Sequence, residues 1–115
     1  MRKIILCVAL LFSASLQAED GVSFQMMEKL GKCEALLGFI GFYGDASDVS
    51  DHATGLALKL DDTESVYIMG FAYGQGWGET REKLAALKRE NEDSAKVEAL
   101  DSLAASECKK IPALM

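Results

Sequence analysis

The residues best suited to metal or acid–base chemistry gather around the only histidine of the chain. His52 lies one helical turn after Asp48 and directly after Asp51. A histidine with two carboxylates can form part of a metal site, but such a site needs another strong ligand, and the surrounding sequence offers none. Carboxylates at this position are more simply helix caps and solvated charge. We therefore expect no metal, no cofactor and no histidine-based catalytic triad.

A glycine-rich run, Gly74-Gln75-Gly76-Trp77-Gly78, is a second candidate for chemistry. A dinucleotide-binding fingerprint needs a third glycine three residues after the second, and Glu79 stands there instead. No Walker-type lysine follows either. Gly70, Gly74 and Gly78 recur every four residues, which favours one face of a helix that packs closely against a neighbouring helix.

Paired carboxylates could in principle carry a hydrolytic reaction. The sequence gives no reason to select one pair, and Glu28 and Glu34 are more simply the solvent face of a helix. We expect a protein that is not an enzyme, and a small hydrolase is the least favoured of three alternatives.

The first residues have the layout of a secretory signal peptide. Arg2 and Lys3 precede an apolar run from Ile4 to Phe12, and small and polar residues follow up to Ala18. The apolar run is too short to span a membrane, so we expect cleavage after Ala18 and no stable membrane anchor. The predicted organisation is a signal peptide, residues 1–18, and a single helical domain, residues 19–115, located in the periplasm or secreted.

Two cysteines remain after processing, Cys33 and Cys108. In an exported protein, a lone pair of this kind most simply forms one disulfide. The bridge would close a loop of 75 residues. In the chain-entropy model, such a loop stabilises the fold by about 4 kcal/mol.

Charge argues against a nucleic-acid partner. Without Arg2 and Lys3, 10 basic residues face 18 acidic ones, which gives a formal net charge of −8. The basic residues are scattered among carboxylates, whereas polyanion binding needs clusters of lysine and arginine.

Helical spacing dominates the rest of the chain. A repeat of about 3.5 residues runs without interruption through the uncharged segment 66–78 and the charged segment behind it, which indicates one long helix. The alternative is a kink or break near Trp77, where the glycines favour the helix least. Ser23 is a suitable N-cap for an earlier helix, and Asp61 with Glu64 resembles a capping box for the long one. The expected helices are Phe24–Tyr43, Asp48–Leu60, Glu64–Glu90 and a last helix that begins after Ser94 and ends at Pro112.

In the last helix, Val97, Leu100, Ala104, Cys108 and Ile111 share one face. Both cysteines then fall on apolar faces of their helices. The predicted fold is all-α, a small three- or four-helix bundle closed by one disulfide. This architecture loosely resembles small periplasmic helical proteins, such as acid-activated chaperones and the immunity proteins that neutralise toxins. No motif is shared with them.

Aromatic and apolar side chains form the one concentration large enough for recognition. The simpler interpretation is that they make up the core, and Trp77 in particular lies on the expected core face of its helix. The alternative is an interface, because tyrosine and tryptophan are favoured anchors for protein partners. The candidate binding residues are Tyr67, Met69, Phe71, Tyr73, Trp77, Phe39, Phe42 and Tyr43.

The expected function is that of a non-enzymatic binding module for another protein, of the inhibitor or immunity type. Self-association through the same residues is the other form this binding could take. The main alternative is an acid-stress periplasmic chaperone. Nothing in the sequence identifies the partner.

Overall fold

The computed structural model describes residues 22–115, so the predicted signal peptide at residues 1–18 and its cleavage site lie outside the described residues. Within the described part, the chain forms helices and connecting turns and no strand. No helix there is both long and apolar enough to cross a membrane. The elements are α2 Phe24–Ile40, α3 Tyr43–Leu58, α4 Thr63–Glu90, α5 Glu92–Ala105, and the short 3-10 helices η1 Cys108–Lys110 and η2 Pro112–Leu114.

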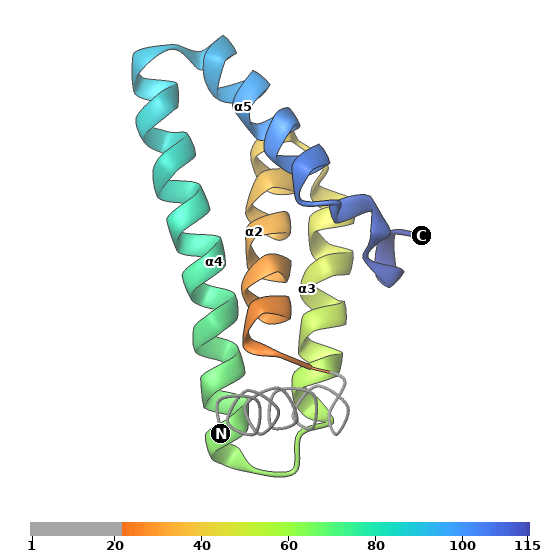
Figure 1. The fold of residues 1–115 in the computed structure, drawn as a ribbon. Coiled ribbons are helices and arrows are strands. Elements are labelled where there is room, and N and C mark those ends of the chain that lie inside the picture. The colour runs from red at the N-terminus through yellow and green to blue at the C-terminus, as the bar shows by residue number, and fades with distance from the viewer. Residues whose placement is uncertain (1–21) are drawn as a thin grey trace, which may run out of the picture.

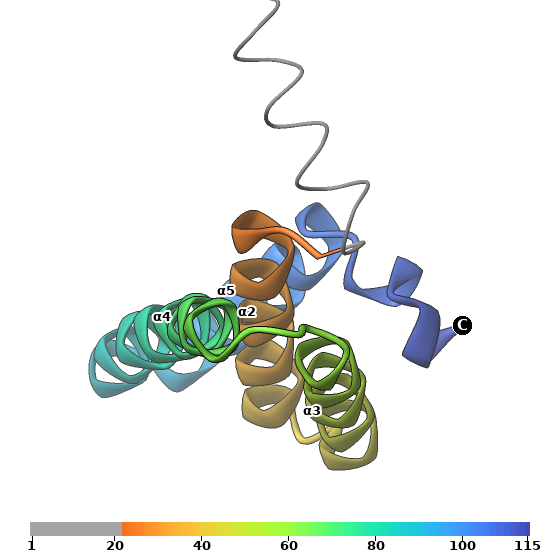
Figure 2. The same ribbon diagram turned by 90° about the horizontal axis from the view of Figure 1, so that it is seen from below.

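Helix α2 is the centre of the bundle (Figures 1 and 2). α4 and α3 lie along two of its sides, and α5 crosses its upper part on a third side. α2 and α4 run in the same direction, and α3 runs in the opposite one (Figure 1). The predicted all-α bundle is confirmed. The buried apolar side chains of α2 are Met27, Leu30, Cys33, Ala35, Leu36 and Leu37.

The turn between α2 and α3 is shorter than predicted. α2 begins after the predicted cap Ser23, whose Oγ accepts a hydrogen bond from the Met26 amide at 3.1 Å. It ends at Gly41, which has a left-handed φ of 105° and reverses the chain at once. The predicted extension of this helix to Tyr43 is therefore wrong, and so is the predicted start of the next helix at Asp48, because α3 already begins at Tyr43. The segment 45–52 is polar because most of α3 faces solvent.

Helix α4 runs unbroken for 28 residues, straight through the glycine-rich run, as predicted. Its cap is Asp62 rather than Asp61, because the Asp62 carboxylate accepts hydrogen bonds from the backbone amides of Glu64 and Ser65. The buried residues of α4 are Ala72, Gly76 and Leu84.

The closest contact of the bundle is a crossing of α2 and α4 at two glycines. A Cβ atom added at Gly31 would overlap the backbone carbonyl of Tyr73, and one added at Gly76 would overlap the carbonyl of Glu28. The prediction of a glycine-mediated helix contact is confirmed here, but the predicted face is wrong. A Cβ atom at Gly70, Gly74 or Gly78 would meet nothing within 4 Å.

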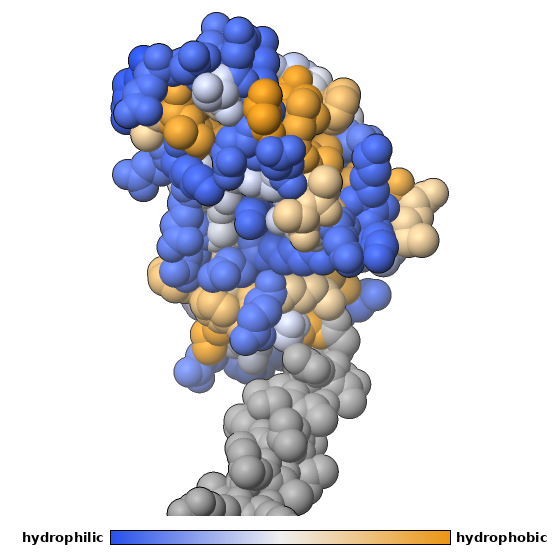
Figure 3. Space-filling view, turned by 45° about the horizontal axis from the view of Figure 1, so that its top comes forward, coloured by the Kyte–Doolittle hydropathy of each residue, from blue (hydrophilic) through white to orange (hydrophobic). Residues whose placement is uncertain are grey.

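Helix α5 presents a different face to the core from the one predicted. Ala95, Ala99 and Leu103 are buried, whereas Val97 and Leu100 are 57% and 52% exposed. The space-filling view accordingly shows hydrophobic patches on the upper part of the molecule (Figure 3). The prediction continued one helical face from Val97 through Cys108 to Ile111. It was wrong because α5 ends at Ala105, before that cysteine.

Beyond α5, the chain turns sharply to bring Cys108 to the core. Glu107 has a left-handed φ of 54° in this turn, and η1 follows. The sulfur atoms of Cys33 and Cys108 form a disulfide with the Cα atoms 5.7 Å apart. Both residues are fully buried. The predicted pairing is therefore confirmed, and it links the middle of α2 to the C-terminal segment.

Candidate binding groove

A groove of about 650 Å³ opens between α3 and α4, with α2 as its floor. It exists because α3 and α4 each pack against α2 and have little contact with one another. The view along the bundle shows α3 and α4 on either side of α2 (Figure 2). We call this space the α3–α4 groove. Its lining comprises Glu34, Ala35, Gly38 and Phe39 of α2, Tyr43, Ala46, Ser47 and Ser50 of α3, and Trp77, Arg81, Ala85 and Lys88 of α4.

The α4 wall of the groove carries the only tryptophan of the chain. Trp77 is half-buried, and the Arg81 guanidinium stacks over its ring with the central carbon 4.8 Å from the ring centroid. This cation–π contact holds the indole in one orientation and keeps the positive charge at the groove. The position of Trp77 in the apolar repeat predicted a fully enclosed core residue. The structure shows that its side chain is only partly enclosed.

A hydrogen bond fixes the lower end of the groove. The Tyr73 hydroxyl donates to Oε1 of Glu34 at 2.7 Å, which joins α4 to α2. Burial of the ring, and then the Glu34 carboxylate, raise the pKa of Tyr73 well above its usual range, so the phenol remains a donor at physiological pH. The expectation that Glu34 belongs to a plain solvent face is wrong, because this carboxylate is half-buried and bonded.

The structure divides the predicted aromatic cluster into separate groups. Phe39, Tyr43 and Trp77 line the groove, and the Tyr73 hydroxyl donates to the groove residue Glu34. Met69 packs against the core. Phe42, Tyr67 and Phe71 are half or more exposed and do not line the groove. The interpretation of the whole cluster as core is therefore wrong.

A second surface, which we call the α4 outer face, consists of Tyr67, Gly70, Phe71, Gly74 and Gly78. Tyr67 and Phe71 are 77% and 67% exposed. The glycines beside them have open space around them. No charged residue occurs between positions 66 and 78, so this face carries no charge.

Sequence reasoning missed the small residues and the cations of the groove. Trp77, Arg81, Ala85 and Lys88 recur at intervals of four, four and three, which is the spacing of one helix face. This pattern was available from the sequence. It went unnoticed because a single alanine and two charges carry no hydrophobic signal.

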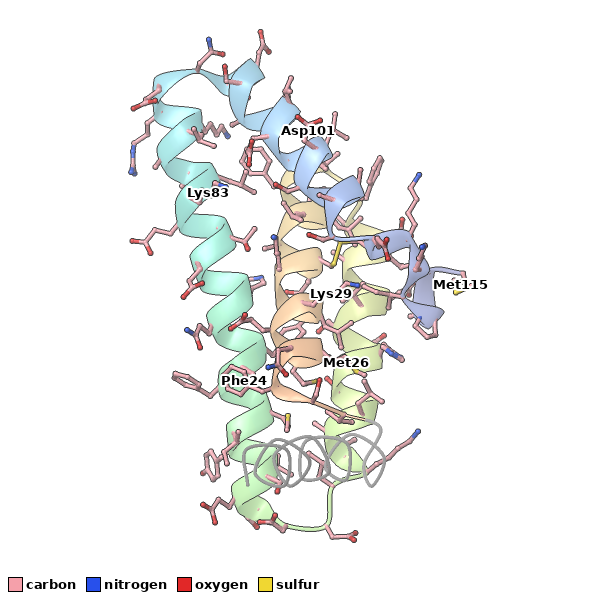
Figure 4. All side chains as sticks on the ribbon, in the orientation of Figure 1. Phe24, Met26, Lys29, Lys83, Asp101 and Met115 are labelled. Atoms are coloured by element: carbon pink, nitrogen blue, oxygen red, sulfur yellow. A yellow bond between two sulfur atoms is a disulfide. The ribbon has the colours of Figure 1, made fainter. Side chains whose placement is uncertain are left out.

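A further groove separates α4 from α5 beside α2, and it is bridged by an ion pair. Lys83 lies on the stretch of α4 beside α5 (Figure 4), and its Nζ is 3.1 Å from Oε1 of Glu98. This contact, and then the Ser102 hydroxyl, lower the pKa of Glu98. Lys83 and Glu98 therefore pair with one another across this groove.

His52 lies in a third, smaller cavity of about 310 Å³ near the C-terminus. Its neighbours there include Lys29, Lys110 and Pro112, and neither Asp48 nor Asp51 lines the cavity. Among residues 22–115, no three histidine, cysteine, aspartate or glutamate side chains come together as metal ligands would.

No protein-family model matches the chain, and comparison with curated proteins and with solved structures gave no significant match.

Proposed function

We propose that this chain is a non-enzymatic binding module that holds a segment of another protein in the α3–α4 groove. The observation that carries this proposal is the half-buried Trp77 beneath Arg81 on the wall of an open groove about 650 Å³ in volume. Tryptophan and arginine are the residue types most often found as anchors at protein interfaces. A groove of this size accommodates several side chains of a partner.

We further propose that this chain is exported, to the periplasm or out of the cell, and that it acts as an inhibitor or immunity-type protein. The buried disulfide between Cys33 and Cys108 supports an oxidising compartment, because such bonds persist there and are reduced in the cytosol. The rigid attachment of α2 to the C-terminal segment also keeps the groove floor in place before binding. A preformed site loses less conformational freedom when it binds.

Gly38 offers a direct test because it lies on the groove floor with open space where a side chain would begin. Gly38→Phe should fill the groove without disturbing the bundle. Gly55→Phe is a matched control, since Gly55 is also a helical glycine with open space but does not line the groove.

The proposal predicts that the wild-type protein and Gly55→Phe retain the same single partner in stoichiometric amount from extracts of the native compartment. Gly38→Phe should lose this partner while its melting temperature stays unchanged. Equal retention by all three proteins would show that the groove is not the binding site.

An acid-stress chaperone is the second candidate, and a different surface supports it. The exposed Tyr67 and Phe71 on the α4 outer face are typical of a surface that holds unfolded clients. This function predicts increased binding of a hydrophobic dye and a change of oligomeric state at about pH 3, where carboxylates lose their charge. Constant dye binding and a constant oligomeric state between neutral and acid pH would contradict it.

A further inference from the structure

The shape of the α3–α4 groove defines what can fill it. Its α4 wall extends from Trp77 to Lys88, which corresponds to about 17 Å or three helical turns. Small residues on each side of the groove, Ala35, Gly38 and Ala46, allow a backbone to approach closely. These dimensions suit one further helix lying along the bundle.

The hydrogen bonding of the walls favours a helix over an extended segment. α2, α3 and α4 satisfy their backbone groups internally, so the groove offers no row of free amides and carbonyls to pair with a strand. An extended peptide would lose its water contacts on entering the groove and gain few hydrogen bonds. A helix carries its own hydrogen bonds, and docking in a groove through one face is an established recognition mode for helices.

The charges of the groove indicate which charge that helix carries. Arg81 and Lys88 form no ion pair within residues 22–115, where the ion pairs are Lys83 with Glu98 and Lys110 with Glu107. The groove carboxylate, Glu34, instead accepts a hydrogen bond from Tyr73. Arg81 and Lys88 therefore place two cations without an ion-pair partner on the same wall of the groove.

We propose that the occupant of the α3–α4 groove is an amphipathic, acidic helix of about three turns from another protein. Its small and apolar side chains face α2, and its carboxylates face Arg81 and Lys88. Arg81 and Lys88 lie seven positions apart, so the carboxylates that meet them are about two turns apart. This inference rests on the proposed function and adds the class of partner.

A displayed library of peptides of about 15 residues, with both helix-forming and proline-containing members, tests this inference. Selection uses the wild-type protein and discards peptides that also bind Gly38→Phe. The expected result is enrichment of helix-forming sequences with aspartate or glutamate seven positions apart. Docking should also remove water from Trp77, the only tryptophan, and shift its fluorescence to shorter wavelength.

Charge reversal provides the matched controls. Arg81→Glu with Lys88→Glu should weaken the selected peptides about tenfold or more, and lysine versions of the same peptides should recover the loss. Lys59→Glu with Lys96→Glu changes the net charge by the same amount outside the groove lining and should leave binding unchanged.

Several outcomes would overturn the inference. These are enrichment of proline-containing or basic peptides, no peptide that distinguishes wild type from Gly38→Phe, and dimerisation of the wild-type protein that Gly38→Phe abolishes. The last result would make a second copy of this chain the occupant. If Gly38→Phe loses the native partner but no acidic helix is selected, the proposed function stands and only this inference fails.

Discussion

Helix α4 carries glycines on two faces, and the structure uses them in opposite ways. At Gly76, the helix meets α2 so closely that a single methyl group would strike the backbone of Glu28. At Gly70, Gly74 and Gly78, a methyl group would project into open space. The regular four-residue spacing therefore occurs on the open face, and the contact depends on one glycine from each helix. Spacing alone does not show which glycines a fold requires.

The largest expected effect tests whether the helix crossing can hold the fold without its covalent link. Cys33→Ala with Cys108→Ala should lower the free energy of unfolding by about 4 kcal/mol, because the bridge closes a loop of 75 residues. Denaturant titration measures the loss. Thiol titration of the denatured, unreduced mature protein, without the leader that contains Cys7, should find no free thiol, and two reactive thiols per chain would contradict the bridge.

Substitution at the contact itself should be nearly as harmful. Gly76→Leu places a side chain where the carbonyl of Glu28 lies, and neither backbone can yield without separating α2 from α4. We expect a loss of about 3 kcal/mol in the free energy of unfolding, measured by thermal and denaturant unfolding. Gly31→Ala should behave similarly, because its Cβ meets the carbonyl of Tyr73. If both variants are as stable as the wild type, the close contact of α2 and α4 does not stabilise the fold.

Trp77 lies between the two glycine faces, and its substitution should have an intermediate effect. Trp77→Ala should cost about 2 kcal/mol rather than the 3 to 5 expected of an enclosed tryptophan, because the ring is only half-buried on a groove wall. Partner binding should be lost at a temperature where the variant remains folded. If the variant is completely unfolded at room temperature, Trp77 contributes to stability as an enclosed core residue would.

The smallest effect, of opposite sign, is expected on the open face. Gly74→Ala should raise the free energy of unfolding by up to about 1 kcal/mol, because alanine favours the helix and nothing opposes its methyl group. Gly78→Ala provides a second example. A loss of stability that depends on protein concentration would instead show that this face is covered by another copy.

Where interactions are local, the sequence predicted the structure well. The cap at Ser23, the long helix through Gly74–Gly78 and the cysteine pair each follow from short motifs or from a two-member choice. Predictions of the buried face failed where a helical repeat was continued past the actual end of the helix. A single helical face from Val97 to Ile111 assigned Val97 to the core, but the helix ends at Ala105 and the turn at Glu107 breaks that face.

The groove was only partly predictable for a related reason. Phe39, Tyr43 and Trp77 were identified because aromatic side chains are conspicuous in a short sequence. The role of Gly38 and Ala85 depends on how far apart α3 and α4 lie, which is a tertiary property. Small residues on a groove wall and on a solvent-exposed helix have the same composition.

The position of the disulfide also determines how the chain responds to mechanical tension. A force applied to its two ends passes through the bridge between Cys33 and Cys108, so the 75-residue loop carries no load. Only the segments outside the loop, among them the first half of α2, bear the force, and α3 and α4 carry none while the bond is oxidised. An unfoldase that pulls one end of the chain through a narrow pore would have to accommodate two chain segments side by side, unless the disulfide is first reduced. Reduction of the disulfide would therefore expose α3 and α4 to the applied force at constant temperature and pH.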